Sequence, residues 1–453
     1  MKITMIGTGY VGLVSGACFS EFGFNVTCVD QDAAKIEALK QGVIPIYEPG
    51  LDRVVEMNAS EGRLDFTTDL DAAVGDAKVV FVAVGTPSRR GDGEADLQYV
   101  HAAARQIARA ARPGTVIVIK STVVVGTTRA VRDIIAAERP DLDFSIAMNP
   151  EFLREGSAIE DFMRPDRVVI GVEDERAETA LRRLYRPLNL RDTPIVVTSL
   201  EDAELAKYAS NAFLAMKVTF INEVADLCEQ VGGNVQDVAK AMGLDNRIGA
   251  KFLHAGPGFG GSCFPKDTRA FAATGQKFSA PQSLVEQVVV VNDTRRADMA
   301  QRILDCLDGD PNGKTVGLLG IAFKPNTDDI REAPSLDIVP ILQEAGLTVK
   351  AHDPAAMEAA KSALPGVVWC ETPADVADQA DAVAILTEWN AYRALDLEAL
   401  ATSMRAPVLL DFRNIYKADE VTGTGLTYRS IGRPELDRHA SATLPRLHED
   451  AAE

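Results

Sequence analysis

Short runs of apolar residues recur along this chain, and longer segments with helical spacing separate them. The first half contains such runs at residues 2–6, 25–30, 78–84, 115–120, 144–148, 167–170 and 194–197. Runs of this length that are apolar at nearly every position are typical of strands buried on both faces. The Ala-rich segments between them predict helices. The alternation therefore indicates a mostly parallel β-sheet with helices on both faces.

The pattern changes at about residue 199, where one long helix is predicted to run to about residue 230. Its apolar positions recur at spacings of one, three and four, and they are Leu205, Tyr208, Ala212, Phe213, Met216, Phe220, Val224 and Leu227. Strand-like runs return at residues 314–319, 347–351, 381–386 and 407–411. We therefore predict an α/β fold in which two doubly wound, Rossmann-like domains are joined by a central helical domain with a long connecting helix.

The size and charge of the chain restrict its class and its partners. A length of 453 residues exceeds what one hydrophobic core usually serves, so two or three domains are expected. The formal net charge of -19 argues against nucleic acid or an anionic membrane as a partner. The sequence contains no apolar run of about 18 residues, so no membrane span is expected. Glycines interrupt the apolar N-terminal stretch, which favours a strand over a signal peptide and the cytoplasm as the location.

Six cysteines lie at positions 18, 28, 228, 263, 306 and 370. None forms a Cys-x-x-Cys pair, and none has a nearby His at a spacing that suits zinc, so we expect neither a disulfide framework nor a metal site. Five of the six are predicted to be small buried side chains. Cys263 is the exception.

The first strand leads into a dinucleotide-binding fingerprint, Gly7-Thr8-Gly9-Tyr10-Val11-Gly12. The glycines permit a tight turn, a close approach of a pyrophosphate and close helix packing, although the same pattern also arises by chance in turns. Asp30 ends the second strand, where a carboxylate bonds the ribose hydroxyls and repels a 2′-phosphate, so NAD is preferred to NADP. Lys35 is predicted to lie near that ribose or on a solvated helix face.

Polar residues follow three further strands, at the sheet edge where open α/β folds bind ligands. Thr86 follows one strand, Thr122 lies in the segment 120–123 after the next, and Glu151 and Glu155 lie in the segment 149–156 after the third. One of the two glutamates is placed to act on a water molecule in a cleft. A solvated helix start, where the helix dipole favours acidic residues, explains the pattern equally well.

Two segments predict covalent chemistry. Lys207 and Asn211 are four residues apart on the long helix, so they share a face and would supply donors to an oxyanion, although a helical lysine is usually solvated. Cys263 lies in Gly-Phe-Gly-Gly-Ser-Cys-Phe-Pro-Lys-Asp at residues 258–267. A helix N-terminus and Lys266 would favour its thiolate, and Asp267 would orient Lys207 or a water molecule. A thiol beside a nicotinamide site indicates oxidation of an alcohol to an acid through a covalent intermediate.

Together with the fingerprint, the segments 120–123, 149–156, 204–213, 258–267 and 322–332 resemble the UDP-glucose/GDP-mannose dehydrogenase family. The resemblance runs in order over residues 1 to about 430 and implies three domains. These are an NAD-binding domain at 1–198, a central helical domain at 199–300 and a C-terminal UDP-sugar-binding domain at 301–438. The remaining residues, 439–453, are expected to form a poorly ordered tail.

The resemblance also implies a four-electron oxidation of the C6 alcohol of UDP-glucose to the carboxylate with two NAD. GDP-mannose, UDP-N-acetylglucosamine and UDP-N-acetylmannosamine are alternative substrates. In this chemistry Cys263 forms a thiohemiacetal and then a thioester, Lys207 and Asn211 stabilise oxyanions, and Thr122, Glu151 and Asp267 handle water and protons. Glu155, Lys266 and Arg331 would lie near NAD.

For the substrate site, the resemblance implies Glu151, Phe152, Leu153, Lys207, Asn211, Phe252, Gly260, Cys263, Phe323, Lys324 and Arg413. It further implies a homodimer or higher homo-oligomer in which Arg247 reaches the neighbouring chain's substrate, whereas an ordinary surface arginine would look the same in sequence.

Two other classes of protein share part of this pattern. A two-electron hydroxyacid dehydrogenase has the fingerprint and an active-site Lys and Asn on a long helix, but it needs neither a nucleophilic Cys nor a second doubly wound domain. A non-catalytic NAD-sensing protein has no use for Cys263 beside Lys207 and Asn211. The number of NAD molecules reduced per substrate separates the three classes.

Overall fold

A computed structural model describes residues 1–87, 89 and 95–434, so the predicted tail at 439–453 lies outside the described residues. Contacts within the chain divide it into two compact units. Unit 1 comprises Met1–Ala212 and Lys266–Val285, and unit 2 comprises Phe213–Pro265 and Glu286–Glu453. Three helices, α9 (Leu200–Val231), α11 (Phe264–Lys277) and α12 (Ser283–Leu304), contribute residues to both units.

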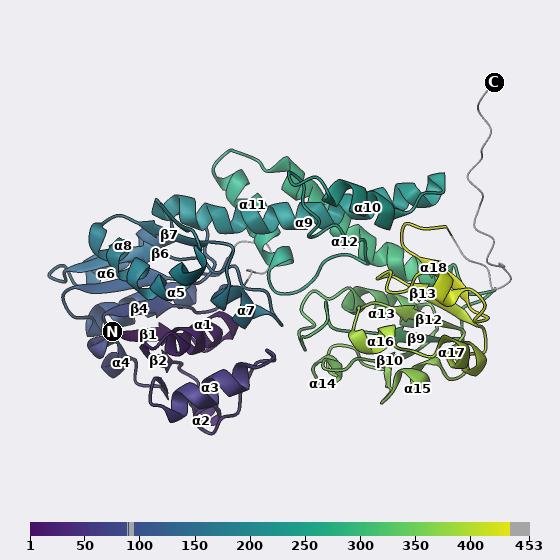
Figure 1. Ribbon diagram of the computed structural model, residues 1–453, viewed down its shortest axis with the longest axis horizontal. Helices are drawn as coiled ribbons and strands as arrows, with labels where there is room; N and C mark the ends of the chain where they lie inside the picture. The colour runs from purple at the N-terminus through teal and green to yellow at the C-terminus, as the bar shows by residue number, and fades with distance from the viewer. Residues whose placement is uncertain (88, 90–94, 435–453) are drawn as a thin grey trace. The chain divides into compact units, whose positions relative to one another are not determined.

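Unit 1 is built on an eight-stranded sheet with the order β3-β2-β1-β4-β5-β6-β7-β8 (Figure 1). All neighbouring strands pair in parallel except β6 and β7, which are antiparallel. The strands are β1 (Lys2–Ile6), β2 (Asn25–Val29), β3 (Leu64–Thr67), β4 (Val79–Val82), β5 (Thr115–Ile119), β6 (Phe144–Met148), β7 (Val168–Val172) and β8 (Ile195–Thr198). Every residue of β4 and β5 is buried, as expected for strands covered on both faces.

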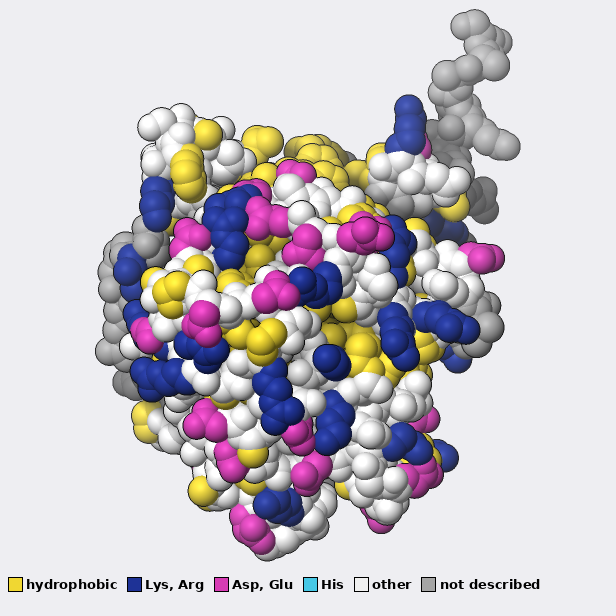
Figure 2. Space-filling view, turned by 90° about the vertical axis from the view of Figure 1, so that its left-hand side faces the viewer, with side chains coloured by type: hydrophobic (Ala, Val, Ile, Leu, Met, Phe, Trp, Pro, Cys, Tyr) yellow, Lys and Arg dark blue, Asp and Glu magenta, His cyan; other side chains and the backbone are white. Residues whose placement is uncertain are grey.

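The helices of unit 1 are mostly the connections between its strands. They are α1 (Tyr10–Glu21), α2 (Ala33–Lys40), α3 (Leu51–Ser60), α4 (Leu70–Asp76), α5 (Gln98–Ala110), α6 (Thr127–Glu138), α7 (Ala158–Met163), α8 (Glu175–Leu184) and the 3-10 helix η1 (Arg186–Arg191). Figure 2 shows one face on which Lys and Arg side chains are intermixed with Asp and Glu. Arg129 and Arg132 of α6 both pair with Glu173.

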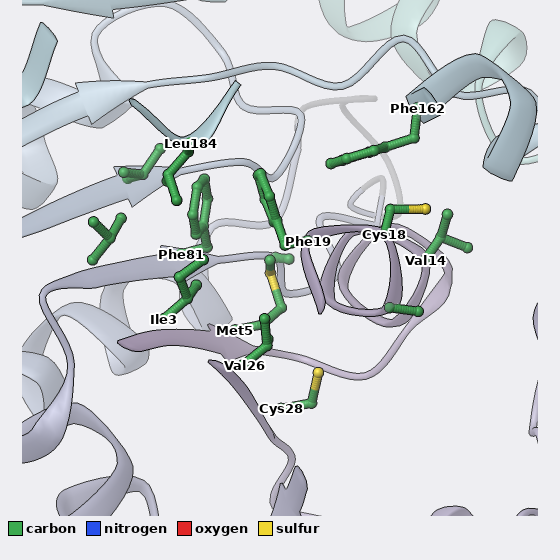
Figure 3. Close-up of a cluster of buried hydrophobic side chains, with 14 of the residues drawn as sticks. Ile3, Met5, Val14, Cys18, Phe19, Val26, Cys28, Phe81, Phe162 and Leu184 are labelled. Carbon is green, nitrogen blue, oxygen red and sulfur yellow. The ribbon is translucent and has the colours of Figure 1, made fainter. Parts of the chain in front are cut away.

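Aromatic side chains fill the centre of the core between α1 and the sheet. The Phe19 ring lies 5.3 Å from that of Phe81, 5.0 Å from that of Phe162 and 5.4 Å from that of Tyr185, measured between ring centroids. Figure 3 shows the Phe19 ring beside that of Phe81, with Met5 below Phe19. This packing fixes α1 on the sheet and therefore fixes the glycine loop that precedes it.

Unit 2 repeats the doubly wound arrangement with a six-stranded parallel sheet of order β11-β10-β9-β12-β13-β14. Its strands are β9 (Thr315–Leu319), β10 (Thr348–His352), β11 (Val368–Trp369), β12 (Ala382–Ile385), β13 (Val408–Asp411) and β14 (Thr427–Ser430). The other helices are α10 (Val235–Gly243), α12 (Ser283–Leu304), α13 (Ser335–Glu344), α14 (Met357–Ala360), α15 (Pro373–Ala377), α16 (Asn390–Arg393), α17 (Leu397–Ser403) and α18 (Ala418–Val421). Within the described residues, none of the helices has the length and apolar character needed to span a membrane.

The predicted fold is confirmed, since both doubly wound sheets and the long helix are present. Three strands were not predicted: β3 contains a charged residue, β11 has two residues and β14 is largely polar. The boundaries at 198, 300 and 438 stay a prediction. Cys306 corrects the expectation of five buried cysteines, because it is partly exposed and its Sγ lies 2.9 Å from Arg429 Nη1.

Candidate active site

The glycine loop of unit 1 connects β1 to α1 and leaves a cradle at the helix N-terminus. A Cβ on Gly7, where φ is +102°, would lie 2.4 Å from the Ala83 carbonyl oxygen, and a Cβ on Gly12 would lie 1.9 Å from the Gly7 carbonyl oxygen. Gly9 is the N-cap of α1, and a Cβ there would meet no heavy atom within 4 Å. Two glycines are thus required by the packing of the backbone, and the third leaves room for a phosphate at a helix N-terminus.

Asp30 follows β2 beside this loop. Its Oδ2 accepts hydrogen bonds from the Thr8 backbone N–H (3.0 Å) and hydroxyl (2.7 Å), and Lys35 Nζ lies 3.5 Å away. Burial alone would raise the pKa of Asp30, but these hydrogen bonds and the Lys35 charge hold it below its ordinary range. The carboxylate is therefore ionised, and it fits a ribose diol while repelling a 2′-phosphate.

The other predicted cofactor residues of unit 1 lie near the same edge of the sheet. Thr86 follows β4, and its hydroxyl donates to the Thr122 carbonyl oxygen, 2.8 Å away, at the end of β5. Tyr10 donates its hydroxyl to buried Glu48, which also accepts the Gly156 N–H. Burial and the Glu48 carboxylate raise the pKa of Tyr10. Glu48 was not predicted from the sequence, because no motif surrounds it.

A buried ion pair joins the segment after β6 to the long helix. Lys207 Nζ of α9 lies 3.0 Å from Glu151 Oε1, and both side chains are at most 5% exposed. Glu151 Oε2 also accepts the Leu153 N–H at 2.5 Å. Burial would raise the pKa of Glu151, but the charge of Lys207 and this N–H outweigh burial and lower it. The solvated alternative for Glu151 and Lys207 is therefore wrong for this chain.

A second buried contact connects α9 to α11. Asn211 Nδ2 donates to Asp267 Oδ2 at 2.6 Å, and Lys266 Nζ pairs with Asp267 Oδ1 at 2.5 Å. The role predicted for Asp267, to orient Lys207 or a water molecule, stays a prediction, and the structure adds Asn211, one turn beyond Lys207 on α9, as a partner of this carboxylate. Lys207 Nζ lies 5.4 Å from the centre of the Phe152 ring, which also stacks on Arg167 at 3.7 Å. Lys207 and Asn211 of α9 thus each contact a buried carboxylate within unit 1.

Within unit 2, the segment that carries Cys263 packs tightly and needs its glycines. Cys263 directly precedes α11 and is partly exposed, with Ser262 Oγ 3.5 Å from its Sγ. A Cβ on Gly260 would lie 2.2 Å from the Glu332 carbonyl oxygen, and one on Gly261 would lie 2.7 Å from the Phe323 ring. The two motifs at 258–267 and 322–332 are therefore in contact.

Arg413 anchors the same region of unit 2. Its guanidinium donates to the carbonyl oxygens of Leu386 (2.7 Å) and Phe323 (3.1 Å) and pairs with Glu388 (3.1 Å). Lys324 Nζ lies 5.2 Å from the Phe323 ring centre. A cavity of about 210 Å³ adjoins Arg413, and its lining comes from α10, the 250–255 segment and Asn414. The cavity and the cation together offer a place for part of a nucleotide.

Three residues of α12, missed in the sequence analysis, hold the approach to Cys263. Asn292 accepts the Phe259 N–H at 2.8 Å and donates to the Phe259 carbonyl oxygen at 3.1 Å. Arg295 donates to the Gly256 carbonyl oxygen at 2.7 Å, and Arg296 to that of Phe259 at 3.1 Å. All three side chains are buried. In the sequence, these polar residues follow the apolar run Val288–Val291 on the same helix. Helical periodicity predicts the helix, but it does not predict which groups the polar side chains contact.

Four more predicted site residues lie in the described part of the chain. Phe252 has a φ of +66°, a strained value for a bulky residue, and its ring lies 5.9 Å from that of Phe264. Arg331 pairs with Asp329, and Arg247 pairs with Asp245 and is 89% exposed. Glu155 is half-buried within the 151–157 segment. The roles of these residues stay predictions.

Models of the UDP-glucose/GDP-mannose dehydrogenase family match three parts of the chain. The family's NAD binding domain matches residues 1–189, its central domain residues 201–294 and its UDP binding domain residues 317–418. The first match covers the glycine loop and Asp30, so the cofactor is NAD.

Relatives and solved structures agree with these matches. A UDP-glucose 6-dehydrogenase of Rhizobium meliloti (strain 1021) is 56% identical over 437 residues, which are 96% of this chain and 100% of that protein. The structure of a UDP-glucose dehydrogenase from Pyrobaculum islandicum superposes with a TM-score of 0.85 at 43% identity, covering 92% of this chain and 95% of that one. A UDP-D-ManNAc dehydrogenase from Pyrococcus horikoshii gives a TM-score of 0.83 at 27% identity, covering 96% and 99%. This chain belongs to the UDP-glucose/GDP-mannose dehydrogenase family.

Proposed function

We propose that the chain oxidises the C6 hydroxyl of UDP-glucose to a carboxylate, with Cys263 as the covalent nucleophile. The observation that carries the proposal is the Cys263 segment: a partly exposed thiol directly precedes a helix whose first turn holds Lys266 and Asp267, and Asp267 is bonded to Asn211. A two-electron alcohol dehydrogenase has no use for that thiol.

Each protein group has one task in the proposed reaction. Cys263 Sγ bonds to the C6 aldehyde carbon to give a thiohemiacetal, the second oxidation converts this to a thioester, and water breaks the C–S bond to release the acid. Bound NAD supplies hydride acceptance for the two oxidations. Lys207 and Asn211 donate to the oxygen on C6, and Thr122, Glu151 and Asp267 receive or position protons and water.

The substrate assignment rests on overall similarity. The relative that is 56% identical is named for UDP-glucose, whereas the structure named for UDP-D-ManNAc is 27% identical although its fold is nearly as similar. Fold alone therefore does not choose the sugar. We propose that the nucleotide sugar contacts Phe152, Leu153, Phe252, Gly260, Phe323, Lys324 and Arg413, with Glu155, Lys266 and Arg331 toward NAD.

Counting NADH tests the proposal directly. UDP-glucose should yield two NADH per molecule consumed, with UDP-glucuronate as the product. One NADH per molecule would indicate a two-electron dehydrogenase, and none with any of the four nucleotide sugars would indicate a non-catalytic NAD-binding protein. Assays with GDP-mannose and the two UDP-N-acetylhexosamines, run in parallel, decide the substrate.

Replacing Asp30 by Asn should weaken the preference for NAD. The change removes the charge that repels a 2′-phosphate and one acceptor for the ribose hydroxyls, so the NAD-to-NADP ratio of kcat/KM should fall about tenfold or more. Asp65→Asn, at an exposed position on β3, is the matched control and should keep the native ratio. An unchanged ratio in Asp30→Asn, or a native chain that uses NADP equally well, would remove Asp30 from this role.

We also propose a homo-oligomer built on dimers. Leu205, Phe213, Phe220 and Leu227 are exposed on α9, and the last three recur every seven residues along one line of the helix. A line of large apolar side chains at this spacing is typical of helix pairing. A cytoplasmic location completes the proposal, since all six cysteines are free, as in proteins of reducing compartments.

If Arg247 completes the site of the neighbouring chain, two inactive variants should restore each other. Arg247→Ala chains keep Cys263, and Cys263→Ala chains keep Arg247, so a mixed dimer contains one site with both groups. Statistical exchange of equal amounts should recover about a quarter of native activity. Mass spectrometry of the intact dimers verifies exchange, and verified mixed dimers without recovered activity would assign Arg247 to its own chain.

A further inference from the structure

A buried lysine that the proposed reaction does not use lies at the start of the 120–123 motif. Lys120 follows β5 and is 3% exposed. Its Nζ donates to Asn149 Oδ1 at 3.1 Å and to Tyr185 Oη at 3.3 Å, and it lies 5.8 Å from the centre of the Phe162 ring. Both hydrogen-bond partners are neutral. Burying an ammonium group among neutral groups costs free energy of folding, so packing alone does not explain a lysine at this position.

Asn149 connects Lys120 to the segment that carries Glu151. The Asn149 N–H donates to the Ile119 carbonyl oxygen at 2.9 Å, and its Nδ2 donates to that of Val169 at 2.9 Å. Its Oδ1 also accepts the Tyr185 hydroxyl at 2.5 Å. Asn149 is thereby fixed to β5, β7 and Lys120 at once, and Glu151 follows it after a single proline. The position of the Glu151 backbone depends on this network.

Two ammonium groups act on the Glu151 carboxylate. Lys207 pairs with it at 3.0 Å, and the charge of Lys120 also stabilises the ionised carboxylate. The other titratable groups that face Lys120 are Cys18 of α1 and Tyr185 after α8. Burial raises the pKa of Cys18 to about 12 and raises that of Tyr185, so both stay neutral. The cluster of Lys120, Lys207 and Glu151 therefore carries one net positive charge.

We propose that Lys120 is a positioning residue for Glu151: held by Asn149 and Tyr185, its ammonium fixes the segment that carries Glu151 and supplies the second positive charge that keeps this carboxylate ionised. The inference rests on the proposed function only for the role of Glu151 in handling water and protons. A carboxylate must be ionised before it accepts a proton, and burial by itself would raise the pKa of Glu151.

The sign of the pH effect follows from these charges. Burial, opposed by the Glu151 charge, lowers the pKa of Lys120 to about 8, so Lys120 is charged at neutral pH. The pKa of Glu151 is lowered, and removing the charge of Lys120 should raise it. Less Glu151 is then ionised at low pH, so the acid limb of the kcat profile should move to higher pH. The basic limb should stay, because Glu151 is ionised there in either case.

The decisive comparison uses Lys120→Gln, which keeps a donor toward Asn149 but removes the charge. The acid limb of kcat should move up by roughly one pH unit. Lys120→Arg should restore the native limb. Tyr185→Phe is the matched control, since it removes a neutral hydrogen bond and keeps the charge, and its acid limb should stay at the native pH. A uniform fall of kcat in Lys120→Gln without movement of the limb would reduce Lys120 to a structural residue and overturn the proposal.

An infrared titration without substrate separates this inference from the proposed function. The carboxylate band that Glu151→Gln removes reports the ionisation of Glu151 whatever reaction the chain catalyses. This band should titrate at higher pH in Lys120→Gln than in the native chain, and equal titration would overturn the inference. If Lys120→Gln does not fold, the infrared titration of Glu151 in the native chain tests the inference instead. A Glu151 band that titrates below the ordinary range of a glutamate supports the inference, and one that titrates above that range contradicts it.

Discussion

Serine in place of Cys263 should lower steady-state formation of UDP-glucuronate by about a thousandfold or more. A hydroxyl is far less ionised than a thiol at neutral pH, and an oxygen ester would have to replace the thioester intermediate. The loop conformation should survive, because Ser is close to Cys in size and the glycines at 260 and 261, which the packing against Glu332 and Phe323 requires, are untouched. Binding of NAD, measured by calorimetry, should therefore be unchanged.

The control for this variant is Cys306→Ser. Cys306 is the other partly exposed cysteine. It lies beside Arg429, and it belongs to none of the sequence motifs of the proposed reaction. Its replacement should leave turnover within about twofold of native. Near-native production of UDP-glucuronate by Cys263→Ser would contradict a covalent intermediate on that residue. Equal losses in both cysteine variants would point to a loss of stability instead.

The sequence predicts the fold well because buried parallel strands carry a signal at nearly every position. The residues of β4 and β12 are all apolar, those of β5 are apolar after Thr115, and the structure confirms all three strands. β14 escapes detection because Tyr428 is the one apolar side chain among Thr, Arg and Ser, so its place in the sheet depends on pairing with β13. Register between distant strands is a tertiary property, which local pattern does not contain.

Motifs predict which residues matter in the candidate site, but not which residues pair. Spacing of four along one helix places Lys207 and Asn211 on one face, and both are buried. Their partners come from segments 56 residues away in sequence for Asn211 and from the end of β6 for Lys207. The hydrogen bond from Asn211 to Asp267 depends on the angle between α9 and α11. That angle is set by tertiary packing, so the identity of the residues does not predict it.

Buried polar residues that support the site are the hardest to find from sequence. Glu48 caps the start of α7 by accepting the N–H groups of Gly156 and Ala158, and Asn292 holds Phe259 through two hydrogen bonds. Both are polar residues that a pattern analysis assigns to the surface. Their burial appears only when the groups that satisfy them are in place.

Glutamine in place of Glu151 should trap the thioester on Cys263. Gln keeps the size of Glu, and its Oε1 still accepts a hydrogen bond from Lys207 or from the Leu153 N–H, so the segment should hold its shape. What it loses is the negative charge and the ability to accept a proton from water. Both oxidations can precede that step, so a burst of about two NADH per active site should be followed by turnover reduced roughly a hundredfold or more.

Intact-mass analysis after acid quenching of Glu151→Gln mixed with UDP-glucose and NAD should find one adduct per chain, with the mass of UDP-glucose less four hydrogens. The adduct should be absent in the double variant with Cys263→Ser, which places it on that residue. Glu160→Gln, at an exposed position in the adjacent helix α7, is the matched control and should show neither the burst nor the adduct. An unmodified mass together with slow turnover would transfer the water-activating role to Asp267, the other buried carboxylate that the family resemblance places in water and proton handling. In that case Glu151 would only hold the Lys207 ammonium in place, and Asp267, which is bonded to Asn211, would be the base.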